Sequence, residues 1–99
     1  MYLVRDIMYC KPGKTRQMVE KFVALAALGQ KMGMGTMRVM TDVSAERYWT
    51  VVAETEVASM EQHAEMARKS MQMPEFQELM KGYHDLVDEG RREIYMIEK

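Results

Sequence analysis

The spacing of hydrophobic positions changes several times along the chain, and each change predicts a boundary between two elements. Residues 2–10 are rich in Tyr, Val, Ile and Leu and predict a strand, which a Pro-Gly turn ends. From Lys14 to about Met32, apolar side chains recur every three or four residues, which predicts an amphipathic helix. Gly33 follows in the position of a left-handed helix cap.

The middle of the chain predicts a hairpin. Residues 35–42 and residues 47–55 have the composition of strands, and the second run is the richer in β-branched and aromatic side chains. The short polar run at residues 43–46 between them predicts the turn.

Two helical segments and a last strand follow the hairpin. Ser59 and Gln62 have the spacing of a capping box, which predicts a helix that begins at Ser59. The apolar stripe expected on this helix consists of Met60, Ala64, Ala67 and Met71. Pro74 suits the first turn of a further helix, which is expected to end at Gly90, and residues 91–98 predict the final strand.

This order of elements predicts an α+β fold with the ferredoxin-like βαββαβ arrangement. Such an arrangement has one antiparallel sheet, with the helices on one of its faces. The chain is short enough to form a single domain over residues 1–99. A domain of this size buries only about 60–65% of its unfolded surface, so its core is thin and it gains from burying a further face in an oligomer.

Both faces of the predicted sheet are expected to be apolar, with a few polar interruptions. In the last strand, for example, Ile94 and Met96 alternate with the equally apolar Tyr95. The helices can cover only one face, and an exposed apolar area of that size implies a partner. The simplest partner is a second copy of the chain, packed sheet to sheet about a two-fold axis.

Composition and charge exclude several kinds of partner. The 14 basic and 15 acidic residues give a formal net charge of -1, which provides no field for nucleic acid and no polybasic patch for a membrane surface. No apolar run is long enough to span a membrane, and none resembles a signal peptide. Together with the single cysteine, Cys10, these features are typical of a protein of the reducing cytoplasm.

Thirteen methionines are an unusual number for 99 residues. Four of them fall within ten positions: Met32, Met34, Met37 and Met40. A soft metal ion such as Cu(I) would need these thioethers to converge, yet Met37 and Met40 differ by three along a strand and point to opposite faces. No His or Cys lies nearby in the sequence, so ordinary packing is expected here and no metal site.

Three segments carry a resemblance to a known superfamily: VRDIMYCKPGK, RYWTVVAETEVASMEQHAEM and MPEFQELMKGYHDLVDEGRREIYMIE. In this order they resemble the dimeric α+β barrel superfamily, above all its NIPSNAP-like and antibiotic-biosynthesis-monooxygenase-like branches. The resemblance implies a homodimer whose sheets face each other as a barrel, with a small pocket in each protomer. The superfamily includes cofactorless monooxygenases, haem-degrading enzymes, isomerases and proteins without known activity, so the fold alone does not decide the function.

Two histidines, His63 and His84, are the candidates for a catalytic base. The commoner role of each is that of a partly exposed helical histidine. The haem-degrading branch resembles this chain in pairing a strand Trp with a helix His, which Trp49 and His63 match. That branch also uses an asparagine on the first strand, and this chain has none. Haem is therefore an alternative to a site without a cofactor.

Five side chains are candidates for ligand binding: Arg5, Tyr9, Arg38, Tyr48 and Trp49. A mid-strand arginine such as Arg5 can bind an anionic ligand, but an ion pair is the commoner role. The acidic partners available to it are Asp6, Glu54 and Glu93. The aromatic candidates can line a pocket for a flat aromatic compound, although packing in the core is the commoner role.

Cys10 lies at a strand end near Lys11 and Lys14, which would lower the pKa of its thiol. No Cys-His or Ser-His-Asp spacing accompanies it, so nothing else indicates a nucleophile. Without a visible catalytic constellation, we favour a non-catalytic dimeric module that binds a small, partly apolar metabolite or stabilises a larger assembly. The alternative is a cofactor-independent monooxygenase-like or isomerase-like enzyme that acts on an aromatic or polyketide-like substrate.

Overall fold

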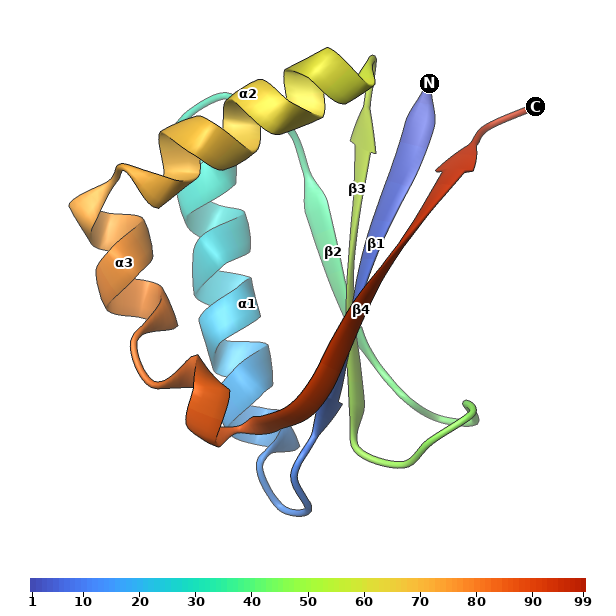
Figure 1. The fold of residues 1–99 in the computed structure, drawn as a ribbon, viewed down its shortest axis with the longest axis vertical. Helices are drawn as coiled ribbons and strands as arrows, with labels where there is room; N and C mark the ends of the chain where they lie inside the picture. Colours follow the sequence, from blue (N-terminus) through green and yellow to red (C-terminus); the bar gives the residue numbers. More distant parts are fainter.

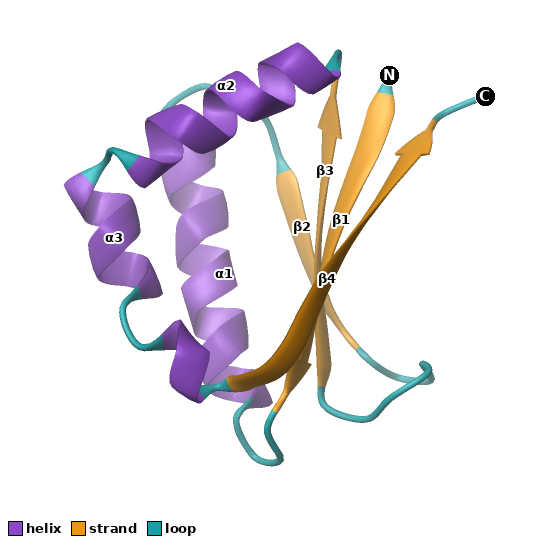
Figure 2. Ribbon diagram, in the orientation of Figure 1, coloured by secondary structure: helices purple, strands orange, loops and turns teal.

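A computed structural model describes residues 1–99, which form a four-stranded antiparallel sheet with its helices on one face (Figures 1 and 2). In chain order the elements are β1 (Tyr2–Cys10), α1 (Thr15–Lys31), β2 (Met37–Thr41), β3 (Thr50–Val57), α2 (Met60–Met71), α3 (Pro74–Met80), the 3-10 turn η1 (Tyr83–Asp85) and β4 (Val87–Met96). The strand order β2-β3-β1-β4 is that of the βαββαβ arrangement, so the predicted fold class is confirmed. None of the helices is both long and apolar enough to cross a membrane.

The end of α1 and the start of α2 follow the local signals of the sequence. Gly33 adopts φ 75° directly after Met32, the left-handed conformation expected of a residue that ends a helix. Ser59 Oγ accepts a hydrogen bond from the backbone N–H of Gln62 at 3.0 Å. The Gln62 side chain in turn accepts one from the backbone N–H of Ala58 at 2.7 Å. The Ser59 cap is therefore confirmed, whereas the reciprocal bond of Gln62 goes to Ala58, one residue before the cap.

The third strand starts later than predicted, because residues 47–49 belong to the loop that joins β2 to β3. Trp49 has φ 63°, which is incompatible with a place in a strand ladder. The loop is held closed by Asp42 Oδ1, which accepts a hydrogen bond from the backbone N–H of Thr50 at 2.9 Å. The aromatic composition of residues 47–49 indicated a strand, but this side-chain hydrogen bond keeps them in the loop.

The prediction that the last helix runs to Gly90 is wrong. Helix α3 ends at Met80, and Gly82 then turns the chain with φ 81°. The 3-10 turn η1 has a repeat of three residues, so the helical spacing of apolar side chains extends beyond the end of α3. Gly90 lies inside β4 opposite Met8, where a Cβ atom would come within 2.9 Å of the Met8 sulfur.

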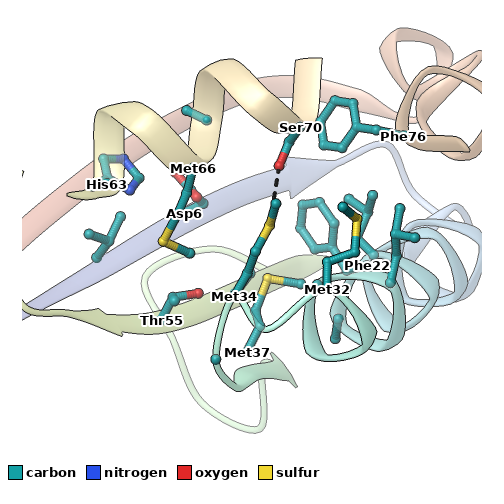
Figure 3. Close-up of a pocket in the computed structure, with 18 of the residues that line it drawn as sticks. Asp6, Phe22, Met32, Met34, Met37, Thr55, His63, Met66, Ser70 and Phe76 are labelled. Carbon is teal, nitrogen blue, oxygen red and sulfur yellow. Dashed lines mark hydrogen bonds between the residues drawn. The ribbon is translucent and has the colours of Figure 1, made fainter. Parts of the chain in front are cut away.

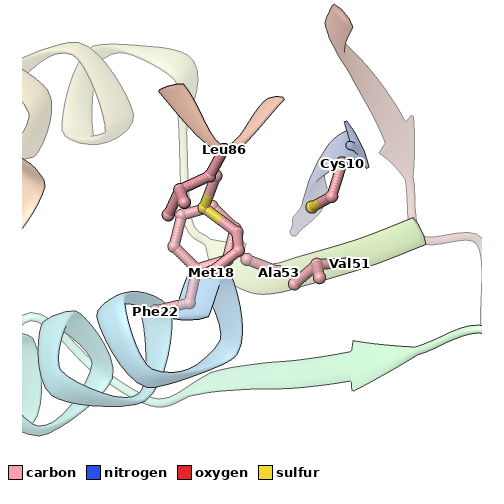
Figure 4. Close-up of a cluster of buried hydrophobic side chains, with 6 residues drawn as sticks. All are labelled: Cys10, Met18, Phe22, Val51, Ala53 and Leu86. Atoms are coloured by element: carbon pink, nitrogen blue, oxygen red, sulfur yellow. The ribbon is translucent and has the colours of Figure 1, made fainter. Parts of the chain in front are cut away.

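The core lies between α1 and the face of the sheet that the helices cover (Figure 4). Its buried members are Cys10, Met18, Phe22, Val51, Ala53 and Leu86. Met18 and Val51 have no exposed surface. Because only 12 of the 99 residues are buried, each core side chain carries a large part of the stability.

Helices α2 and α3 cover the same face of the sheet but contribute no buried residue. The end of α3 is held to α1 by Lys21, whose Nζ donates hydrogen bonds to the backbone oxygens of Leu79 at 3.0 Å and Lys81 at 2.7 Å. These two helices therefore stand away from the sheet, and the space beneath them is not filled by core packing.

The opposite face of the sheet is not the apolar surface that the strand pattern predicted. Arg5 and Glu54 lie opposite each other on the two central strands, and Arg38 reaches Glu54 from the edge strand β2. The polar residues that interrupt the apolar pattern of separate strands lie side by side across the sheet and form one charged cluster. Apolar side chains such as Leu3 and Ile7 lie along the same face of β1.

Truncation of Met18 to alanine is expected to lower the free energy of unfolding by about 2–4 kcal/mol, because it leaves a cavity in a thin core. The matched control is Val23→Ala in the same helix, where the side chain is 53% exposed and little should change. Urea denaturation of the three proteins measures both effects. Equal losses for the two variants would contradict this assignment of the core.

Candidate functional site

A cavity of about 360 Å³ lies between the three helices and the covered face of the sheet (Figure 3). Of its 24 lining residues, 16 are hydrophobic, and they include Phe22 from α1 and Phe76 from α3. All four strands contribute to the lining. The volume and the mostly apolar wall are those of a site for a small molecule.

Eight of the thirteen methionines line this cavity. They are Met8, Met32, Met34, Met37, Met66, Met71, Met73 and Met80. The Met-rich stretch therefore contributes three side chains to a single wall, while Met40 does not reach it. Ser70 Oγ donates to the sulfur of Met34 at 3.7 Å across the cavity from α2. A wall of flexible, polarisable thioethers can adapt to the shape of a ligand.

One end of the cavity is polar, and its three ionisable side chains contact one another. Arg92 on β4 donates from Nε to Oδ1 of Asp6 on β1 at 2.6 Å. The Nη1 atom of the same guanidinium lies 3.3 Å from Nε2 of His63, in the first turn of α2. Because a guanidinium only donates, His63 Nε2 accepts this hydrogen bond and the ring proton lies on Nδ1. Asp6, Arg92 and His63 are called the polar cluster below.

The side of helix α2 that faces the cavity overlaps its predicted stripe only in part. Ala67 and Met71 line the cavity as the stripe predicted, but Met60 and Ala64 do not. His63, Met66 and Ser70 line it in addition (Figure 3). Alanine and methionine give a weak hydrophobic signal, so two neighbouring stripes of this helix looked similar in the sequence. The structure thereby places His63 at the centre of the inward side instead of beside it.

Asp6 and Arg92 were not among the candidates from the sequence. Asp6 carried a signal, because it is an acidic residue on the covered side of a central strand. Its pairing with Arg92 depends on the register of β1 with β4, in which these two residues are direct partners. Nothing in the sequence fixes that register, so the polar cluster is visible only in the structure.

The two candidate arginines lie on the opposite face of the sheet and share one acidic partner. Arg5 Nη2 is 2.6 Å from Glu54 Oε2, and Arg38 Nη2 is 2.7 Å from Glu54 Oε1. Arg5 also reaches Glu93, with 3.7 Å between Nη1 and Oε1. The Glu54 side chain is only 6% exposed, and each of its oxygens pairs with its own, more exposed guanidinium. Of the acidic partners offered for Arg5 by the sequence, Glu54 and Glu93 pair with it, whereas Asp6 pairs with Arg92 on the other face.

The aromatic candidates lie outside the cavity. Tyr9 is buried beneath the guanidinium of Arg47, whose Cζ is 4.2 Å from the ring centroid. Tyr48 is almost fully exposed in the loop between β2 and β3. Neither residue lies among those that line the cavity.

His84 and Trp49 are both separated from His63. His84 stacks on Tyr83 in η1, with ring centroids 4.0 Å apart, and does not line the cavity. Trp49 precedes β3 and His63 follows it, and an eight-residue strand spans about 25 Å. The Trp-His pairing of the haem-degrading branch is therefore not formed, and the chain has no asparagine, so these residues do not fit a haem site of that kind.

The expectation that neighbouring lysines lower the pKa of Cys10 is wrong. Burial of the thiol raises its pKa, and the negative charges of Asp42 and Asp88 raise it further. The side chain belongs to the core cluster. Elsewhere, no group of three or more His, Cys, Asp or Glu side chains is arranged to hold a metal ion.

Solved structures of other proteins have the same fold. A NIPSNAP-like domain protein from Burkholderia xenovorans superposes with a TM-score of 0.81 at 18% identity, over 97% of this chain and 84% of its own. A NIPSNAP family protein of unknown function from Agrobacterium tumefaciens gives 0.80 at 16% identity, over 96% and 86%. An antibiotic-biosynthesis-monooxygenase-like protein from Nitrosomonas europaea gives 0.75 at 14% identity, over 100% of both chains.

At these identities the likeness establishes the fold and does not transfer an activity. No protein-family model and no curated protein matches the sequence. The resemblance seen in the sequence is therefore confirmed for the fold. Any function has to be argued from the cavity and the charged groups themselves.

The charge of Glu54 is expected to make the stability depend on pH. Burial alone would raise the pKa of this carboxyl, but hydrogen bonds from Arg5 and Arg38 outweigh burial, so the pKa is lowered. The stabilisation is therefore complete above the ordinary pKa of about 4.3 and is lost as the pH falls through the lower folded value. Glu54→Gln should destabilise the protein by about 1–3 kcal/mol at pH 7 and by less in acid.

Urea denaturation of both proteins between neutral and acidic pH measures this difference. Glu56→Gln is the matched control, because Glu56 is exposed two residues further along the same strand and forms no ion pair. A gap between wild type and Glu54→Gln that stays constant with pH would refute the role of the charge.

Proposed function

We propose that this chain, which has the ferredoxin-like fold of NIPSNAP-like and antibiotic-biosynthesis-monooxygenase-like proteins, is a homodimer that binds a small, partly apolar metabolite. The cavity of about 360 Å³, with a Met-rich wall and the polar cluster at one end, is the observation that carries this proposal. A ligand that binds in this cavity of the folded chain and not to the unfolded chain stabilises the fold.

A second copy of the chain is supported by the apolar side chains near the end of β4. Ile94, Tyr95, Met96 and Ile97 are each between 36% and 60% exposed. They alternate between both faces of an edge strand whose outer backbone groups have no neighbouring strand. A homodimer that covers this strand buries the side chains and the free edge together.

The setting that suits this module is the cytoplasm, without a nucleic-acid or membrane partner. The net charge of -1 provides no attraction for a polyanion. The only cysteine is free and buried, which is compatible with a reducing compartment.

A second candidate function is that of a cofactor-independent monooxygenase-like or isomerase-like enzyme. The observation in its favour is His63, whose ring lines the cavity and is oriented by Arg92. In this role Arg92 moves away from Nε2 of His63, and the freed nitrogen takes a proton from an aromatic or polyketide-like substrate. Oxygen uptake with a dihydroxynaphthalene, lost in His63→Ala while binding persists, would favour the enzyme. Binding without turnover favours the module.

Filling the cavity is expected to abolish ligand binding. Ala67 of α2 lines the cavity, so Ala67→Trp should weaken binding of the neutral fluorescent probe N-phenyl-1-naphthylamine by about tenfold or more. Ala64→Trp, on the same helix but outside the cavity lining, is the matched control and should bind normally. Fluorescence titration measures both affinities. Equal binding by the two variants would refute the cavity as the binding site.

Sedimentation equilibrium at micromolar concentration is expected to give the mass of two chains of 11.6 kDa each. Tyr95→Lys should shift the equilibrium toward monomer, because it places a charge on the apolar edge strand. Val43→Lys is the control, since Val43 is fully exposed in the loop between β2 and β3. A well-folded wild-type monomer at this concentration would overturn the homodimer.

A further inference from the structure

We propose that the ligand of the cavity is a monocarboxylate with an apolar body, and that Arg92 binds its carboxylate. This inference rests on the proposed ligand-binding function and names the class of ligand. It follows from the hydrogen-bonding groups that the polar cluster leaves free and from the charges that line the rest of the cavity.

The guanidinium of Arg92 has hydrogen-bond donors that no other residue of the protein uses. Of its five N–H groups, Asp6 accepts the one on Nε and His63 accepts one from Nη1. The other three, including both on Nη2, have no partner within the protein. Both N–H groups of Nη2 and one of Nη1 remain, which is enough to donate a hydrogen bond to each of the two oxygens of a carboxylate. The side chain is 52% exposed, so a ligand can reach it.

The other free groups of the polar cluster also favour an acceptor on the ligand. With Nε2 of His63 occupied by Arg92, the nitrogen that remains is the Nδ1–H donor. One carboxylate oxygen of Asp6 is taken by Arg92, which leaves Oδ2 as the single free acceptor against four free donors. A head group that accepts hydrogen bonds is therefore better matched than one that donates them.

Asp6 also holds the guanidinium in place. Its hydrogen bond to Nε fixes the plane of the Arg92 side chain, so binding of a carboxylate costs less conformational entropy than it would at a freely rotating arginine. Asp6 offsets part of the positive charge of Arg92. The expected preference for a carboxylate therefore comes from the paired donors and their orientation more than from net charge.

The remainder of the cavity limits the ligand to one charge. Apart from Asp6, Arg92 and His63, no ionisable side chain is among its lining residues. A second charged group on the ligand would lie against methionine and phenylalanine side chains without a partner, at a high desolvation cost. An aromatic or aliphatic body with one carboxylate satisfies both ends of the site.

The test compares three probes with the same alkyl chain: decanoate, decanol and decylamine. Each is titrated against the wild-type protein loaded with N-phenyl-1-naphthylamine, and the loss of fluorescence reports displacement. Decanoate should displace the probe at a concentration about tenfold lower than decanol does, as expected for two charge-assisted hydrogen bonds, and decylamine should be the weakest. This comparison uses the unaltered protein, so it does not depend on the folding of any variant.

Arg92→Gln should remove the preference for decanoate over decanol. Arg91→Gln is the matched control, because it removes the same charge from the neighbouring position of β4, which faces the other side of the sheet. Equal displacement by decanoate and decanol, or tighter binding of decylamine, would overturn the carboxylate while leaving the cavity site intact. If the protein binds neither the fluorescent probe nor any alkyl compound, the proposed function fails as well.

Discussion

The pairing of β1 with both β3 and β4 decides where the chemistry of this molecule lies. Side chains of a strand alternate between its two faces, so neighbouring Arg5 and Asp6 are sent to opposite sides of the sheet. The register then places Glu54 beside Arg5 on one side and Arg92 beside Asp6 on the other. A slip of one residue would exchange the two faces and break both pairs. The charged cluster and the polar end of the cavity therefore depend on the same ladder of backbone hydrogen bonds.

The second constraint is the uneven way in which the helices cover the sheet. Only α1 carries buried side chains, among them Met18 and Phe22. Helices α2 and α3 have none, and their place is set by the cap at Ser59 and by the hydrogen bonds from Lys21. From within α2, His63 and Ser70 make polar contacts with Arg92 and Met34, but no side chain of α2 or α3 is buried, so the space beneath these helices stays open. The cavity thus results from how the helices are anchored.

Most of the fold could be predicted from the sequence, because its signals are local. The caps at Gly33 and Ser59 and the change of period after the first strand each depend on residues a few positions apart. The predictions that failed involve competing local signals. Residues 47–49 have strand composition but lie in the loop that the hydrogen bond from the Thr50 N–H to Asp42 closes. The three-residue repeat of η1 resembles helical spacing, so the sequence predicted one helix through Gly82, where the chain turns.

The candidate site was less accessible to sequence reasoning. His63 was identified because it is one of only two histidines, and the structure places it on the cavity. Its neighbours come from strands at opposite ends of the chain, so no spacing in the sequence relates Asp6 to Arg92. The methionines were seen as a compositional excess, but their common wall forms only when both α2 and α3 are in place. The register of the strands and the distance between the helices and the sheet could not be predicted from the sequence.

The methionine wall has a consequence for how this scaffold diverges. Exchanges between methionine and leucine keep the volume of a side chain and commonly cost less than about 1.5 kcal/mol. Point mutations can therefore change the shape of the cavity while the pairing of β1 with β4 keeps Asp6 and Arg92 in place. Proteins with this architecture can therefore change which small molecule they bind through successive exchanges, each of which leaves the fold stable.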